Sequence, residues 1–156
     1  MSDFYLTLKL IHILGAAVLF GTGLGIAFFM LMAHRTRDAA AIAATARTVV
    51  IADALFTATA VVIQPVTGAA MAWLVGFSLF HWWIVATIVL YVMVGLCWLP
   101  VVWIQIQLRN LAADAAKRGT PLPQRYDDLF RIWFWLGWPA FAGVIAIFAL
   151  MIWKPM

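Results

Sequence analysis

Four long apolar segments dominate this chain and leave it few possible folds. They cover about residues 4–33, 48–75, 82–107 and 132–153. Each holds at least the ~20 residues with which an α-helix crosses the ~30 Å hydrocarbon core of a bilayer. None of them alternates apolar and polar residues as the strands of a membrane β-barrel do. The segments therefore predict four transmembrane helices.

The composition excludes a soluble domain of this size. Of the 156 residues, 67% are hydrophobic and only 10% are charged, whereas a soluble domain carries roughly a quarter charged residues. The first segment is too long for the apolar region of a signal peptide, so we expect it to remain as an uncleaved span. The single cysteine, Cys97, excludes an intrachain disulfide and a CxxC metal motif. Residues 1–156 are therefore predicted to form one transmembrane domain.

The basic residues predict how the helices are oriented. Two polar connections, 34–47 and 108–130 with Arg131 at its edge, hold eight lysines and arginines, and the opposite side holds only Lys9 and Lys154. The positive-inside rule then places both connections in the cytoplasm and both termini outside. This distribution also explains the +4 net charge without a nucleic-acid partner. We expect an all-α, antiparallel four-helix transmembrane bundle, N-out and C-out, in a bacterial cytoplasmic (inner) membrane.

The first segment carries two ionisable residues, Lys9 and His12, in otherwise apolar sequence. Polar groups in hydrocarbon are costly unless they are paired, so we expect them to face the bundle interior. His12 can ligate haem iron through a ring nitrogen, and the small residues Gly15, Ala16 and Gly23 would let a flat macrocycle approach the backbone. Alternatively, His12 donates to a carbonyl of a neighbouring span. Lys9 is either a partner for a haem propionate or a lysine that snorkels to the interface.

Two further histidines lie at segment ends. His81 begins the third segment on the same side as His12, so it is a candidate second axial ligand, although it lies nearer the interface. Alternatively, it is an interfacial histidine beside Trp82 and Trp83. His34 follows the first segment, ~33 Å from His12 along a helix. The two cannot share a metal, and we expect His34 to be a solvated residue at a helix end.

The second segment contains Asp53 and Gln64. A buried carboxylate must be paired or neutral, and the candidate partners of Asp53 are Arg131, Gln105 and Gln107; proton uptake is the functional alternative. Gln64 can contact a porphyrin or quinone, or it can rebond the helix that the adjacent proline breaks.

Prolines and small residues predict where helices bend and approach one another. Pro65, Pro100 and Pro139 each remove a backbone donor inside a span and free the carbonyl four residues earlier. Those carbonyls belong to Val61, Leu96 and Trp135. Ala17, Gly21 and Gly25 form a small-xxx-small seam for close helix contact.

Several stretches together resemble a large bacterial family of four-span membrane proteins of unknown function. They are YLTLKLIHILGAA, FGTGLG, IQPVTG, LYVMVGLCWLPVVWIQIQL, PLPQRYDDLFRIWFWLGWPAF and the closing MIWKP, which together extend over nearly the whole chain. That family is distantly similar to the haem-binding, HemJ-type protoporphyrinogen oxidases and to the CopD copper-resistance membrane family.

The HemJ resemblance rests on Lys9-x-x-His12, His34 and Thr67-Gly68. It implies that His12 binds haem. In the third segment the HemJ pattern has a lysine and a downstream histidine, where this chain has Trp82, Trp83 and Val94.

These observations predict a b-type haem-binding inner-membrane protein that transfers electrons to or from a quinone or porphyrin. Haem b is the expected cofactor, with His12 as its ligand. One alternative is a non-catalytic membrane scaffold or assembly partner, which would form homo-oligomers through Gly21 and Gly25. Another is a small copper transporter, which would need several copies of the chain to form a pore.

Overall fold

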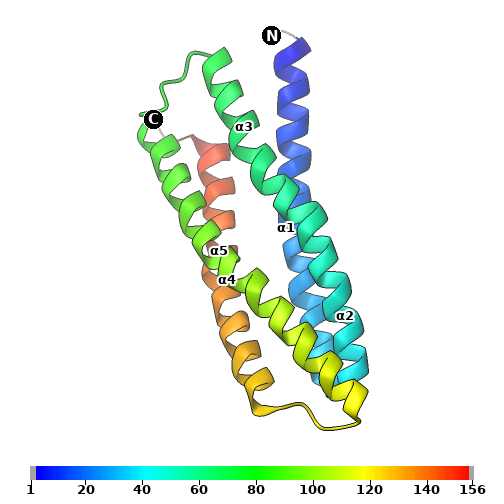
Figure 1. Ribbon diagram of the computed structural model, residues 1–156. Coiled ribbons are helices and arrows are strands. Elements are labelled where there is room, and N and C mark those ends of the chain that lie inside the picture. The colour runs from blue at the N-terminus through cyan, green and yellow to red at the C-terminus, as the bar shows by residue number, and fades with distance from the viewer. Residues whose placement is uncertain (1–2, 155–156) are drawn as a thin grey trace.

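The computed structural model describes residues 3–154, and every regular element in this range is a helix (Figure 1). No strand occurs within these residues. Because α2, η1 and α3 follow one another without a break, the described residues form four rods, each long and apolar enough to cross a membrane. The predicted all-α, four-helix fold is confirmed. The elements are α1 (Asp3–Thr36), α2 (Ala39–Ala52), the π-helical turn η1 (Asp53–Thr57), α3 (Ala58–Leu74), α4 (Trp82–Arg118) and α5 (Gln124–Trp153).

The helices extend well beyond the apolar segments. The connections predicted at 34–47 and 108–130 are mostly helical, and only residues 37–38 and 119–123 separate the rods there. Both connections are rich in alanine, which favours a helix, although their charged residues are expected to lie outside the hydrocarbon. The true breaks carry terminal signals: Asp38 accepts a hydrogen bond from the Ala40 N–H at 2.9 Å, and Gly119 ends α4 with φ 63°.

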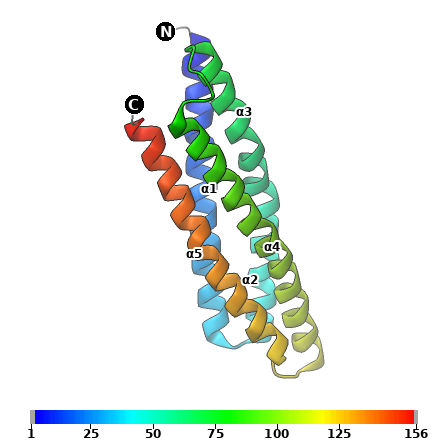
Figure 2. The same cartoon turned by 90° about the vertical axis from the view of Figure 1, so that its left-hand side faces the viewer.

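The helices run up and down, so that neighbours in sequence pack together in space. α1 lies along α2, η1 and α3, while α2 packs on α4 and α4 packs on α5. Both ends of the chain lie at one end of the bundle, and the α1–α2 and α4–α5 turns lie at the other (Figures 1 and 2). We call these the termini end and the turn end. α1 and α4 are consequently diagonal to each other.

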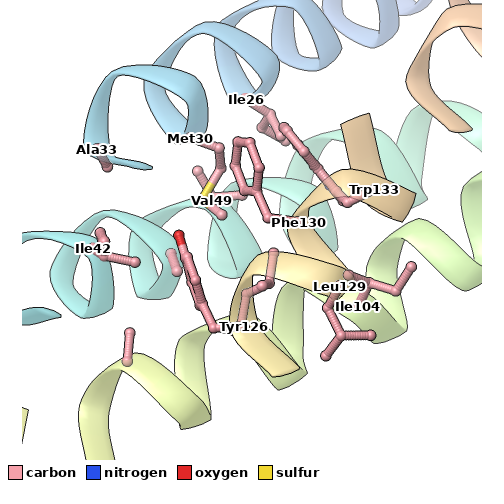
Figure 3. Close-up of a cluster of buried hydrophobic side chains, with 13 residues drawn as sticks. Ile26, Met30, Ala33, Ile42, Val49, Ile104, Tyr126, Leu129, Phe130 and Trp133 are labelled. Atoms are coloured by element: carbon pink, nitrogen blue, oxygen red, sulfur yellow. The ribbon is translucent and has the colours of Figure 1, made fainter. Parts of the chain in front are cut away.

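The buried core lies at the turn end. Met30, Ile42, Leu108 and Tyr126 are fully covered there, and Figure 3 shows side chains from α1, α2, α4 and α5 directed into one cluster. Toward the termini end, α1 stays with α3 and α4 stays with α5, and Figure 1 shows these two pairs diverging. The single chain is therefore tightly assembled at one end and more open at the other.

Large apolar side chains cover the outside of the rods. Leu96, Val62 and Trp135 are each more than 60% exposed. Such a surface suits hydrocarbon and would be unfavourable in water, since soluble monomers expose only small apolar patches. The chain is an integral membrane protein with four apolar spanning helices.

Candidate functional site

α1 and α3 meet at a set of polar groups in the termini half of the bundle. His12 Nδ1 lies 2.8 Å from Thr67 Oγ1. One turn away, Gln64 Nε2 donates to the His12 carbonyl at 2.8 Å. Thr67 is buried and His12 is half-buried. Gln64 therefore rebonds no carbonyl of its own broken helix, and it ties α3 to the backbone of α1.

The Thr67 hydroxyl determines which nitrogen of His12 is free. Its oxygen lies 2.7 Å from the carbonyl of Ile63, one turn earlier in the same helix. A hydroxyl has one hydrogen and a carbonyl can only accept, so this contact is a hydrogen bond only when Thr67 donates to Ile63; we therefore assign His12 Nδ1–H as the donor to Thr67 Oγ1. Nε2 then carries the lone pair of the neutral ring. A ring nitrogen with a lone pair can coordinate a metal or accept a proton.

Two glycines allow this close approach of the helices. A Cβ on Gly15 would lie 2.5 Å from Gln64 Nε2, and a Cβ on Gly68 would lie 3.3 Å from His12 Cε1. The space beside Gly15 is thus filled by an amide of the same chain. Gly23 is in ordinary contact range of Phe141 on α5, and Ala16 is half-buried on α1.

The proline of this region is compensated from another helix. Pro65 leaves the carbonyl of Val61 without its usual helical donor, and the hydroxyl of Tyr91 on α4 donates to that carbonyl. The freed carbonyl was expected from the sequence, and the donor was not. This hydrogen bond joins α4 of one helix pair to α3 of the other.

His81 and Lys9 lie apart from the His12 contacts. His81 is exposed just before α4, and its Nδ1 donates to the Ser78 carbonyl at 2.7 Å. Within residues 3–154, no hydrogen bond or ring contact joins His81 to His12. Lys9 is exposed on α1, one turn before His12.

Asp53 is the buried carboxyl of the second span. It is 3% exposed in the π-helical turn η1, and its Oδ1 accepts from Trp98 Nε1 at 3.2 Å. The predicted partners were wrong: Arg131 and Gln107 do not bond it, and Gln105 is fully buried with its amide unpaired among the described residues. An indole N–H inside an apolar run was the available signal for Trp98.

A second polar region lies at the turn end. Arg37 binds Asp127 through two parallel bonds of 2.5 and 3.0 Å. His34 is half-buried and stacks on Phe130 with ring centroids 3.7 Å apart, and its Nδ1 lies 3.4 Å from the Tyr126 hydroxyl. The expectation of a solvated His34 was therefore wrong, because helix α5 extends past the apolar segment and covers it.

Charges and burial shift the pKa values of His34 and Asp127, which lie outside the apolar segments 4–33 and 132–153. The hydrogen-bonded guanidinium of Arg37 lowers the pKa of Asp127. Burial, and then the positive charge of Arg37, lower the pKa of His34. These shifts favour the ionised form of Asp127 and the neutral form of His34.

The remaining sequence candidates are not brought together. Gly21 has no atom of another residue near its missing Cβ, and Gly25 has only Phe29 of its own helix. The small-residue seam is therefore not used inside the chain. Among residues 3–154, no three His, Cys, Asp or Glu side chains form a group that could hold a metal ion. Cys97 is half-buried and free.

The comparisons with known proteins agree with the architecture. No curated protein and no solved structure matched the chain, so the resemblance to the HemJ-type and CopD families stays a prediction. A family of membrane proteins matched residues 6–155, which is nearly the whole sequence. The chain therefore belongs to the family described as "Predicted integral membrane protein (DUF2269)".

Proposed function

We propose that this chain binds haem b in the membrane through Nε2 of His12 and takes part in electron transfer. The observation that carries the proposal is the 2.8 Å contact between His12 Nδ1 and Thr67 Oγ1. Histidines that ligate metals commonly donate their other ring N–H to an oxygen, which fixes the tautomer and the ring orientation. Thr67 supplies that oxygen.

The residues around His12 suit one axial ligand. The ring is half-buried between two helices, and Gln64 holds the same residue through its backbone carbonyl at 2.8 Å. Haem, when bound, would supply one-electron redox chemistry. Lys9 has the charge that a propionate would require. His81, exposed at the start of the diagonal helix with its Nδ1 bonded to Ser78, is the candidate second ligand.

The visible spectrum of the protein, purified in mild detergent and titrated with haemin, tests this proposal. We expect a Soret band that shifts on reduction with dithionite and is lost in His12→Ala, while His34→Ala keeps it. Thr67→Val should retain binding with a weakened or altered spectrum, since second-sphere changes typically cost about 10–100-fold in metal affinity. Folded wild-type protein that takes up no haemin would contradict the proposal.

A non-catalytic scaffold is the second candidate, and the same contacts favour it in a different way. In a scaffold, the hydrogen bonds that join His12 and Gln64 to the facing helix serve as structural links between α1 and α3 and have no further role. In that case His12→Ala lowers stability and changes no spectrum. The uncovered face at Gly21 would then serve contact with another chain.

The orientation of the bundle forms part of the proposal. The eight basic residues at the turn end favour a cytoplasmic location for it, and the His12 region then opens toward the periplasm of a bacterial inner membrane. Cysteine labelling in intact cells distinguishes the two orientations. In a Cys97→Ser variant, a cysteine is introduced either at Ser78 or at Gly119, both of which are exposed. A thiol reagent that does not cross the membrane should label the cysteine at position 78 and not the one at position 119. A quinone or a porphyrin arriving through the lipid is the expected redox partner.

A further inference from the structure

A cavity of about 540 Å³, open along the surface like a groove, lies between α1 and α5 at the turn end. It is separate from the His12 region, which lies in the other half of the bundle. Its lining changes from charged to apolar across a few residues of each helix. The lining residues are Leu31, His34, Arg35, Gln124, Asp127, Phe130, Arg131 and Phe134.

Two arginines give the cavity its charge. Arg35 follows the apolar segment 4–33 and Arg131 precedes the segment 132–153, so both lie at the level where the hydrocarbon ends. Neither forms an ion pair within residues 3–154. The one carboxylate in the lining, Asp127, has both oxygens bonded by Arg37. An unmatched positive charge therefore remains at the mouth of the cavity.

The start of α5 adds to this positive character. Gln124 is the first residue of that 30-residue helix, and Pro123 before it makes no side-chain cap. The first-turn N–H groups and the helix dipole carry partial positive charge, and the Asp127 carboxylate of the same turn is already bonded by Arg37. His34, stacked on Phe130, forms a flat wall beside this turn.

The deeper lining is apolar. Leu31 lies one turn before Arg35 on α1, and Phe134 lies about one turn after Arg131 on α5, so both point to the membrane side of the arginines. An inorganic ion would use only the upper part of such a cavity. A molecule with an anionic head and a hydrocarbon chain would use both parts.

We propose that this cavity binds the phosphodiester headgroup of an anionic phospholipid between Arg35 and Arg131, with an acyl chain along Leu31 and Phe134. Guanidinium groups bind phosphate oxygens through paired hydrogen bonds. Their level in the bundle is that of lipid phosphates. The inference goes beyond the proposed haem site and does not depend on it.

Binding of phosphatidylglycerol to the full chain in detergent, counted by native mass spectrometry, tests the proposal. We expect one phosphatidylglycerol to remain bound at concentrations where phosphatidylcholine does not. The double variant R35Q/R131Q should bind it roughly tenfold or more weakly, since each basic residue near a charged lipid contributes about 1 kcal/mol. Arg125→Gln is the control, because Arg125 lies in the first turn of α5, less than two turns before Arg131, and does not line the cavity.

Three outcomes would overturn it. If Arg125→Gln weakens binding as much as R35Q/R131Q, the attraction is a general effect of charge. If inorganic phosphate or glycerol phosphate displaces the lipid at equal concentration, the site is for a free anion. If the wild-type chain binds phosphatidylglycerol no more tightly than phosphatidylcholine, no headgroup site exists. The charge-retaining R35K/R131K guards against a folding defect in the first double variant, since it should bind phosphatidylglycerol more tightly than R35Q/R131Q does.

Discussion

Thr67 links the fold to the chemistry of His12, because one hydroxyl both closes a bond within α3 and receives the imidazole N–H. Neither residue type in isolation indicates this. A histidine in a span is a candidate ligand by composition alone, and only the contact across 55 positions of sequence fixes its tautomer. The sequence could predict His12 as the residue of interest, but it could not predict the residue that orients it.

Thr67→Val tests the contact at the residue scale. Valine has the same shape and lacks the hydroxyl, so the His12 N–H loses its acceptor while packing is kept. We expect a loss of about 1 kcal/mol in unfolding free energy, since hydrogen bonds between membrane helices average roughly 0.6 and reach about 1.7 kcal/mol. Thr59→Val is the control, because Thr59 bonds only the Leu55 carbonyl of its own helix. Equal effects of the two substitutions would show that the interhelical bond is not formed.

The partial burial of His34 leads us to expect that the stability of the protein depends on pH. Its pKa is lowered in the folded protein by burial and by Arg37, so the unfolded chain binds its proton more readily. The contribution of His34 to the free energy of unfolding is therefore fully present above the ordinary histidine pKa of ~6.5, and it is lost as the pH drops below that value. Thermal midpoints measured from about pH 7.5 to about pH 5.5 should decrease for the wild type and change less for His34→Phe, which keeps the stacking on Phe130. Parallel pH profiles of the two proteins would contradict this role.

At the scale of elements, the prolines and glycines show how far sequence reasoning reaches. It predicted which carbonyl Pro65 frees, because that follows from helix geometry alone. It did not predict that Tyr91 of α4 would bond that carbonyl. Likewise, Gly21 and Gly25 had the spacing of a contact seam, whereas the glycines at which an added Cβ would be most crowded are Gly15 and Gly143. Spacing along one helix does not specify which face meets a neighbour.

A double-mutant cycle between Pro65 and Tyr91 tests this compensation. Tyr91→Phe alone should cost about 1 kcal/mol, because the Val61 carbonyl loses its donor. In a Pro65→Ala background the Ala N–H can bond that carbonyl within the helix, so Tyr91→Phe should cost much less. Unfolding titrations of the four proteins give the coupling energy. Additive effects would indicate that Tyr91 contributes through packing alone.

Gly143 marks a close approach of α5 to α4. A Cβ there would lie 2.6 Å from Val94 Cγ2 and 3.0 Å from Met93 Cε. Gly143→Ala should therefore destabilise the protein by about 1–3 kcal/mol, the usual cost of overpacking, and Val94→Ala should recover part of that loss. Gly137→Ala on the same helix has open space around it and should be neutral or stabilising by up to about 1 kcal/mol. The same loss at both glycines would contradict the close contact.

At the scale of the whole molecule, the fold class was predictable and the position of the core was not. Segments of 20 or more apolar residues require spanning helices, so hydropathy alone gives the four rods. Hydrocarbon is as apolar as a protein core, however, so a buried residue and a lipid-facing residue have the same composition. Met30 is fully covered and Phe28 is 57% exposed, although both belong to one apolar run. Only the three-dimensional arrangement shows that the core lies at the turn end.

This location of the core predicts that the chain tolerates a cut at the opposite end. The α3–α4 connection, residues 75–81, is exposed throughout, while the core that joins the two halves lies near the other turns. Residues 1–78 and 79–156, produced together, should therefore assemble and copurify through a tag on one half. Met30→Ala should weaken that assembly, because it leaves a cavity where all four rods meet and truncation of a buried methionine costs about 2–5 kcal/mol in well-packed cores. Phe28→Ala, a truncation on the same helix that faces outward, should not. Halves that copurify equally well with either substitution would show that the contacts at the termini end, such as Tyr91 with Val61, hold the molecule together instead.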